Sequence, residues 1–199
     1  MAEHGKTHLK PWEIALLCAL CLTLVSALWA QGRSEAIDGA LVRLHVLAVD
    51  DSEEEQALKL RVRDAVLDCL SARLEGAESK AEAAEILSEA LPEIQNAAAE
   101  AAEGRPVTVT LGRERYPTRL YGALALPAGE YDSLRVILGE GRGQNWWCVV
   151  FPPLCMSVES TEEFEQAVGE ETFQILSADG RTSYRFRLLE LWGELVSGF

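Results

Sequence analysis

Residues 139–155, GEGRGQNWWCVVFPPLC, restrict the fold of this chain more than any other segment. Glycine at alternate positions allows tight turns, adjacent tryptophans need apolar surroundings, and paired prolines fix the backbone. Few local structures satisfy all three demands at once. The combination predicts a constrained surface segment that either contacts a partner or is locked against the rest of its domain.

The chain has 199 residues, which leaves one domain of ordinary size once an N-terminal leader is set aside. We expect the leader at residues 1–33 and a single mature domain at residues 34–199. The formal net charge is -14 at pH 7. Because proteins bind nucleic acid through clustered lysine and arginine, this acidic composition argues against a nucleic-acid partner.

An uncharged apolar run, IALLCALCLTLVSALWA, fills residues 14–30. As a helix it is roughly 25 Å long, which is marginal for a membrane span and suits either a secretory signal peptide or a short signal anchor. Val25 and Ala27 offer a cleavage site after Ala27. Both fates of the leader stay open, and a retained leader would contact the membrane through residues 14–30. With either fate, we expect export of the domain.

The mature domain begins with a strand and a helix. Residues 41–49 alternate in a way that predicts a strand buried chiefly on one face. Ser52 and Glu55 then form a capping-box pattern, which predicts a helix that begins near Glu53. Gly76 is the expected end of this helix.

A second capping-box pattern, Ser79 and Glu82, begins the next helical segment. Pro92 interrupts its apolar stripe, and proline removes a helical hydrogen bond while suiting a first turn. We therefore expect a break at Leu91 and a new alanine-rich helix to Gly104, as two helices or as one kinked helix.

The sequence then changes to β character. Alternating apolar residues at 107–111 and 134–138, and the run WWCVVF at 146–151, predict three strands. The glycines within 139–143 predict a flexible hairpin connection. Residues 173–176 are a further candidate strand, and apolar spacing at 188–196 predicts a C-terminal helix. The order is an N-terminal strand, a helical segment, an antiparallel-type β region and a C-terminal helix, which indicates an α+β fold.

Cys148 and Cys155 are separated by six residues that include the turn Pro152-Pro153. This spacing can bring their Cα atoms within the roughly 4.4 to 6.8 Å that a disulfide requires, and export favours oxidation. A disulfide would close a small loop that presents the tryptophan pair. The alternative is two separate buried thiols.

Motifs of enzymes and of metal sites are absent from the sequence. A cysteine nucleophile needs a histidine base and a third group that orients it, and His45 is the single histidine of the mature domain. Its place within a strand predicts a structural role, against the alternatives of catalytic base or metal ligand. The acidic run at residues 50–55 lacks the glycine of an EF-hand loop, and acids there complement the dipole of the following helix. We expect no enzymatic activity, no cofactor and no metal.

Trp146 and Trp147 are adjacent, so on a strand they point to opposite faces and only one of them can enter the core. The other needs a partner. Exposed tryptophan beside proline is typical of an interface anchor. The alternative is packing within the domain, for example against Trp192 of the C-terminal helix.

The chain resembles the stage II sporulation protein R family of endospore-forming bacteria. The resemblance rests on RLHVLA at residues 43–48, SEEEQALKLRVRDAVL at 52–67, YPTRLYG at 116–122, LPAGEYDSLRVILGEGRGQNWWCVVFPPLC at 126–155 and YRFRLLELW at 184–192. Two places depart from the family pattern. Residues 48–52 read AVDDS where Ala-Asn-Ser-Asp-Ser is usual, and Met156 and Ser157 replace an aromatic and aliphatic pair.

The resemblance implies a protein that is made in the forespore and exported into the space between the two membranes. There it would activate a membrane-embedded aspartic protease of the mother cell, which then processes pro-sigma-E. By this interpretation the chain is a ligand of the protease. We expect the contact surface to consist of Trp146, Trp147, Phe151, Pro152 and Pro153. The turn at residues 50–52, with Asp50 and Asp51, is a second candidate.

Two other classes of protein remain as alternatives. One is an extracytoplasmic thiol-dependent enzyme that uses Cys148 or Cys155, although the sequence supplies no base to form the thiolate. The other is a membrane-tethered structural protein whose leader is never cleaved.

Overall fold

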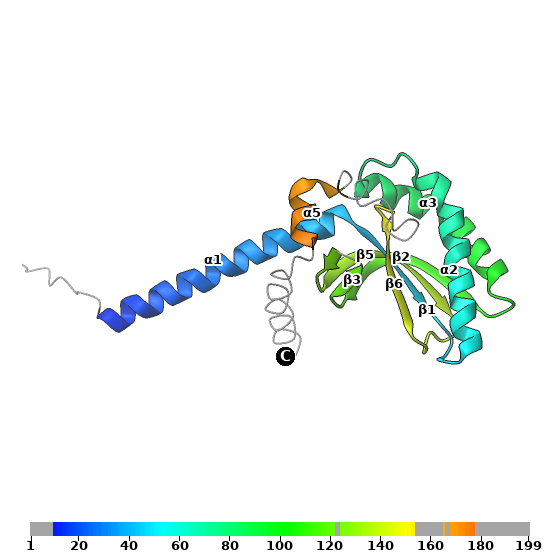
Figure 1. The fold of residues 1–199 in the computed structure, drawn as a ribbon, viewed down its shortest axis with the longest axis horizontal. Helices are drawn as coiled ribbons and strands as arrows, with labels where there is room; N and C mark the ends of the chain where they lie inside the picture. Colours follow the sequence, from blue (N-terminus) through cyan, green and yellow to red (C-terminus); the bar gives the residue numbers. More distant parts are fainter. Residues whose placement is uncertain (1–9, 122–123, 154–164, 166–167, 178–199) are drawn as a thin grey trace, which may run out of the picture. The chain divides into compact units, whose positions relative to one another are not determined.

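The computed structural model describes residues 10–121, 124–153, 165 and 168–177 (Figure 1). The chain divides into two compact units, Met1–Glu35 and Ala36–Phe199, and each is considered by itself. The expected C-terminal helix at 188–196, Cys155 and Trp192 lie outside the described residues.

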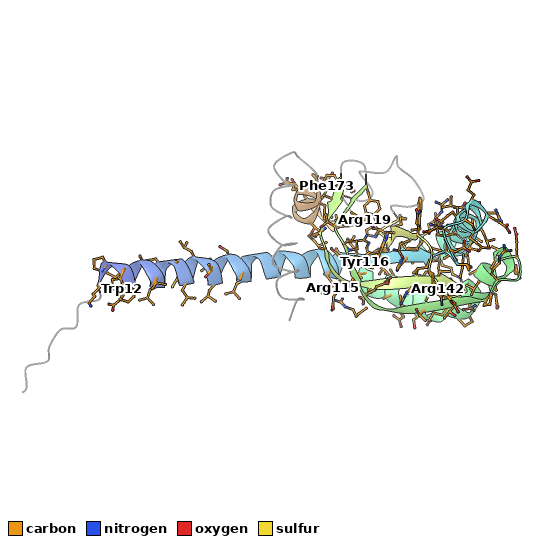
Figure 2. All side chains as sticks on the ribbon, turned by 90° about the horizontal axis from the view of Figure 1, so that it is seen from below. Trp12, Arg115, Tyr116, Arg119, Arg142 and Phe173 are labelled. Atoms are coloured by element: carbon orange, nitrogen blue, oxygen red, sulfur yellow. The ribbon has the colours of Figure 1, made fainter. Side chains whose placement is uncertain are left out.

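Helix α1 (Pro11–Ala40) contains the apolar leader. Its segment Pro11–Leu28 has a mean hydropathy of 1.9 and is long and apolar enough to cross a membrane. Large apolar side chains project from both sides of this helix in Figure 2, and those that are exposed include Ile14, Leu16, Leu20, Leu22, Leu24 and Leu28. A helix that is apolar on every side is stable in lipid rather than in water. Because a signal sequence near the N-terminus has the same properties, the helix fits a signal peptide or a signal anchor.

The second unit is built on a four-stranded sheet in the order β2-β5-β1-β6. Its strands are β1 (Val42–Leu47), β2 (Val107–Tyr116), β5 (Gly129–Leu138) and β6 (Asn145–Phe151). Strand β1 is parallel to β5 and antiparallel to β6, and β2 is antiparallel to β5. The predicted α+β fold is confirmed. The β region is mixed, however, because the N-terminal strand inserts between β5 and β6.

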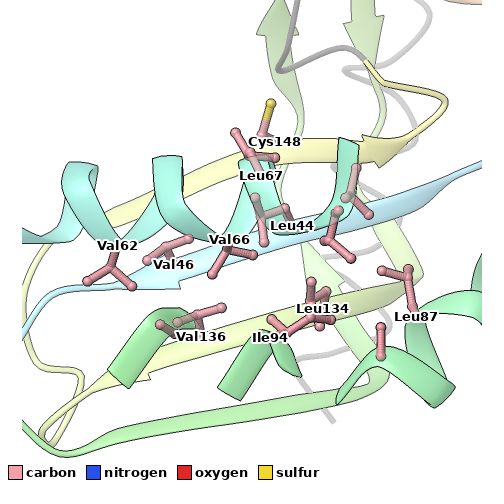
Figure 3. Packing of buried hydrophobic residues seen from close by; sticks show 14 of the residues in the cluster. Leu44, Val46, Val62, Val66, Leu67, Leu87, Ile94, Leu134, Val136 and Cys148 are labelled. Carbon is pink, nitrogen blue, oxygen red and sulfur yellow. The ribbon is translucent and has the colours of Figure 1, made fainter. Parts of the chain in front are cut away.

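Helices α2 (Glu53–Leu74) and α3 (Lys80–Ala101) cover one face of this sheet. Figure 3 shows the core between the two helices and the sheet, here called the helix-side core. Helix α2 contributes Val62 and Val66 to it, and α3 contributes Leu87 and Ile94. The strands meet these helices with alternate residues, among them Leu44, Val46, Leu134, Val136 and Cys148. The helix boundaries near Glu53 and Gly76 were predicted correctly, and Gly76 has the left-handed φ of +92° that favours glycine after a helix.

The opposite face of the sheet carries a second core, formed by Ile37, Leu41, Tyr116, Leu126, Tyr131, Val149 and Leu176. The small sheet of β3 (Arg119–Tyr121) and β4 (Leu124–Leu126) and helix α5 (Glu170–Leu176) contribute to it. All six residues of β1 are consequently buried. The expectation that this strand is buried chiefly on one face was wrong, because a central strand between two cores has no solvent-facing side.

Two further expectations about local structure need correction. The expected break at Leu91 was wrong: of the two alternatives, α3 is one helix that passes through Pro92. Pro92 and Ser88 are both exposed, so water can bind the carbonyl that proline leaves without a donor, while Leu87 and Ile94 anchor the helix on either side. Residues 173–176, expected as a strand, belong to α5.

Candidate partner-binding surface

The turn at residues 50–52, here called the 50–52 turn, is ordered by its own side chains. Asp50 Oδ1 accepts hydrogen bonds from Ser52 Oγ at 2.6 Å and from Ser52 N at 2.8 Å. These bonds lower the pKa of the Asp50 carboxyl, since they stabilise its charged form. Ser52 Oγ also accepts a hydrogen bond from Glu55 N at 3.4 Å and thereby caps α2.

The capping box at this position is only half formed. Glu55 was expected to return its carboxylate to the backbone of Ser52, but Asp50 occupies that backbone donor. The Glu55 carboxylate instead accepts hydrogen bonds from Arg105 at 2.7 and 2.9 Å. These bonds raise the pKa of Arg105 and hold the start of α2 against the segment that precedes β2.

Residues 139–145, here called the 139–145 loop, run from the end of β5 to Asn145, the first residue of β6, across the end of β1. The expectation of a hairpin was wrong, because β1 lies between the two strands that the loop connects. Backbone hydrogen bonds tie the loop to the end of β1: Arg142 N donates to Val49 O at 3.2 Å and Gly143 N to Ala48 O at 3.0 Å. A Cβ atom on Gly143 would lie 2.3 Å from Asp50 O, so this close approach requires glycine.

The 50–52 turn and the 139–145 loop, far apart in the sequence, therefore lie side by side. Gln144 N donates to Asp51 Oδ1 at 2.7 Å, which joins them directly. Asp50, Asp51, Glu140, Arg142 and Gln144 are exposed on this joint surface. Two segments that the sequence singled out independently thus form one surface at the end of β1.

The two tryptophans follow this loop on β6 and point to opposite faces of the sheet, as predicted. Trp146 packs against the helix-side core, and the guanidinium of Arg63 lies 4.5 Å from its ring centroid. Trp147 packs on the second core, where its ring stacks on His45 with centroids 4.0 Å apart. The expectation that only one ring can enter a core was wrong, because this sheet has a core on each face. Both residues remain partly exposed.

The remaining residues of the predicted contact segment lie at the other end of β6. Phe151 is buried in the helix-side core, Pro152 is buried and Pro153 is exposed. The register of β6 against β1 runs from Asn145 opposite Leu47 to Phe151 opposite Val42. These ends are roughly 20 Å apart in a strand of this length. The structure therefore brings the tryptophan end of the segment, and not its proline end, close to Asp50 and Asp51.

A partly buried polar cluster on the second face was not predicted from the sequence. His45 Nδ1 lies 2.8 Å from Glu114 Oε1, and His45 Nε2 lies 2.8 Å from Asn145 Oδ1. Ser133 Oγ donates to Glu114 Oε2 at 2.9 Å. The expected structural role of His45 agrees with this geometry, since both ring nitrogens have hydrogen-bond partners. The one signal in the sequence was polar residues at alternate positions of an otherwise apolar strand.

Arg43 is the neighbour of His45 on the same face and is fully buried. Its Nε donates to Cys148 O at 3.0 Å and its Nη2 donates to the Tyr121 hydroxyl at 2.8 Å. The guanidinium also lies over the ring of Tyr116, 4.2 Å from the centroid, and 5.1 Å from that of Tyr131. Burial raises the pKa of the Tyr116 and Tyr131 hydroxyls. Aromatic faces thus surround a cation that has no carboxylate hydrogen-bonded to it among the described residues.

Among the described residues, Cys148 does not lie beside a histidine that could act as its base. The side chain of Cys148 belongs to the helix-side core, whereas His45 lies on the other face of the sheet. Backbone of the sheet therefore separates the two side chains. Within the described ranges, no three His, Cys, Asp or Glu side chains gather as metal ligands would. The predicted disulfide between Cys148 and Cys155 stays a prediction, because Cys155 lies outside the described residues.

Residues 38–161 match the family described as stage II sporulation protein R, which is more than half of the chain. The chain belongs to the stage II sporulation protein R family. The matched range contains all four strands of the main sheet, helices α2 and α3, and both segments of the surface described above. Membership assigns the chain a role in sporulation.

The chain is also 38% identical over 130 residues to the stage II sporulation protein R of Bacillus subtilis (strain 168). The aligned region is 63% of this chain and 58% of that protein, so the chain spans somewhat more than half of its relative. No solved structure matches the chain.

Proposed function

We propose that the chain is an intercellular signalling protein of endospore formation, which activates a membrane-embedded aspartic protease that processes pro-sigma-E. The forespore makes the protein and exports it into the space between the two membranes, where the protease of the mother cell binds it. Family membership is the observation that carries this proposal. The apolar helix near the N-terminus supports it as well, since export requires such a segment.

The protein acts in this proposal as a ligand and performs no chemistry. A ligand shifts its receptor toward the active state only by binding that state more tightly than the inactive one. A surface that is already ordered suits this purpose, because little conformational entropy is lost when it binds. The 50–52 turn, the 139–145 loop and the tryptophan pair supply such a surface, joined by the hydrogen bonds described above.

Reconstitution of pro-sigma-E processing, with and without the chain, tests this proposal. The protease and pro-sigma-E are placed in vesicles, and the chain is added from the side that corresponds to the intermembrane space. Processing should require the chain. Equal processing in its absence would refute the proposed function.

A second experiment separates the domain from its leader. Residues 34–199, exported behind an unrelated signal peptide, should still activate the protease if the leader serves only for delivery. Loss of activation, with normal export and folding, would indicate that residues 14–30 act directly. It would favour the membrane-tethered alternative. Mass analysis of the exported protein shows whether cleavage follows Ala27.

A further inference from the structure

Lys59 of α2 is buried, with 4% of its surface exposed. Its Nζ donates to Gln144 O at 2.8 Å and to Gln56 Oε1 at 2.6 Å. Gln56 Nε2 in turn donates to Asp50 O at 2.8 Å. A continuous series of hydrogen bonds thus runs from the 139–145 loop through Lys59 and Gln56 to the 50–52 turn.

An ammonium group at this position is costly for the fold. Burial lowers the pKa of Lys59, and the nearby charge of Arg63 acts in the same direction, while Asp51 opposes both. Its described hydrogen bonds go to the loop carbonyl and to the Gln56 amide, with no carboxylate among them. An apolar side chain of similar length would fill the same space without this desolvation. Packing of the core alone therefore does not require a lysine here. The hydrogen bonds of Lys59 instead hold the 139–145 loop and Gln56 in place.

We propose that Lys59 is a positioning residue, which locks the 139–145 loop to the 50–52 turn so that the two segments meet the protease as one rigid surface. This inference rests on the proposed function and names the face of the domain that performs it. Because Lys59 and its hydrogen bonds lie beneath the surface, Lys59 need not contact the partner. Without Lys59, the two segments keep only the direct hydrogen bonds from the loop amides of Arg142, Gly143 and Gln144. More of their ordering then occurs when the protease binds, and that ordering weakens binding.

The test compares three variants of the full chain, each titrated against the protease in vesicles while pro-sigma-E processing is followed. Lys59→Met keeps most of the side-chain volume and removes both hydrogen bonds. Gln56→Ala breaks the same series of bonds from a partly exposed position. Arg61→Met is the matched control, because it removes a cation from the same helix, where Arg61 is half exposed and paired with Glu103.

We expect Lys59→Met to raise the concentration for half-maximal activation about tenfold and to leave the maximal processing rate unchanged. Gln56→Ala should raise it by a smaller factor, and Arg61→Met should match the wild type. Hydrogen exchange directly measures how firmly the 139–145 loop is held. The amides of Arg142 and Gly143, which donate to Val49 and Ala48 just after β1, should exchange faster in Lys59→Met than in the control.

Activation by folded Lys59→Met at the wild-type concentration would overturn the inference while the proposed function stands. If Lys59→Met fails to fold, Gln56→Ala decides the matter, and wild-type activation by that variant would overturn the inference equally. A wild-type chain that does not activate the protease at all would refute the proposed function and with it this role of Lys59.

Discussion

The imidazole of His45 lies flat on the indole of Trp147, with ring centroids 4.0 Å apart and ring planes 10° apart. The two residues face each other across β1 and β6. Tyr116 meets the same indole edge to face at 4.6 Å. The strand register therefore fixes the position of a tryptophan that the sequence analysis assigned to the protease.

Both tryptophans should contribute to stability. Trp147→Ala removes the stacking on His45 and should lower the free energy of unfolding by about 2 to 4 kcal/mol. Trp146→Ala loses its packing against the helix-side core and Arg63, and should cost a similar amount. Urea unfolding measures both free energies. Processing of pro-sigma-E should then be assayed under conditions in which both variants are folded. A variant that keeps wild-type stability and fails to signal would identify its ring as the anchor.

Glu114 should stabilise the partly buried polar cluster around His45. Glu114→Ala leaves His45 Nδ1 and the Ser133 hydroxyl without their acceptor, which should cost about 1 to 3 kcal/mol. Glu89→Ala is the control, since Glu89 is an exposed carboxylate on α3. Chemical denaturation of the two variants gives the comparison. Equal stabilities would show that the cluster contributes nothing.

Gly143 should not tolerate a side chain, whereas Gly112 should. Gly143→Ala places a Cβ atom 2.3 Å from Asp50 O, so the loop must move away from the turn, at a cost of roughly 1 to 3 kcal/mol. Gly112→Ala meets nothing within 4 Å and should change stability by less than about 0.5 kcal/mol. Melting curves distinguish the two. If the joint surface contacts the protease, only Gly143→Ala should also impair activation.

Alkaline pH should unfold the domain through its buried tyrosines. Burial raises the pKa of Tyr116, Tyr121 and Tyr131 above the ordinary value of 10.0. The unfolded chain therefore loses these protons first as the pH rises. Their contribution to stability is complete below pH 10 and declines above it, toward the raised values of the folded state. Phenolate absorbance and circular dichroism should change together. Ionisation of all three tyrosines in a folded domain would contradict the burial.

Cys148 and Cys155 should be joined in the exported protein. Peptide mapping without reductant should recover their two peptides as one linked species, with Cys69 as a thiol that stays free. A loop of this length should stabilise the domain by about 2 kcal/mol. Two thiols that both react with alkylating reagent, in material prepared without reductant, would contradict the pairing.

The sequence by itself determined the type of most described elements. Periodicity identified β1, α2, β2, β5 and β6, because the apolar residues of each element recur at helical or strand spacing. Local capping chemistry predicted the start of α2, since Ser52 and the amide that it caps are three residues apart. The motifs of residues 139–155 and 43–64 were sufficient to indicate the family.

Only the tertiary structure decided how these elements meet. The sequence predicted a hairpin, but β1 lies between β5 and β6, so the loop that connects them crosses the end of β1. Strand pairing depends on contacts between distant segments, which the spacing of apolar residues within a strand does not specify. The same insertion buried β1 on both faces and gave each tryptophan a core of its own. Lys59 and Gln144 are 85 positions apart, and their hydrogen bond exists only after the sheet has formed. Local sequence specifies local structure, whereas contacts between distant segments depend on the free energy of the whole packed domain.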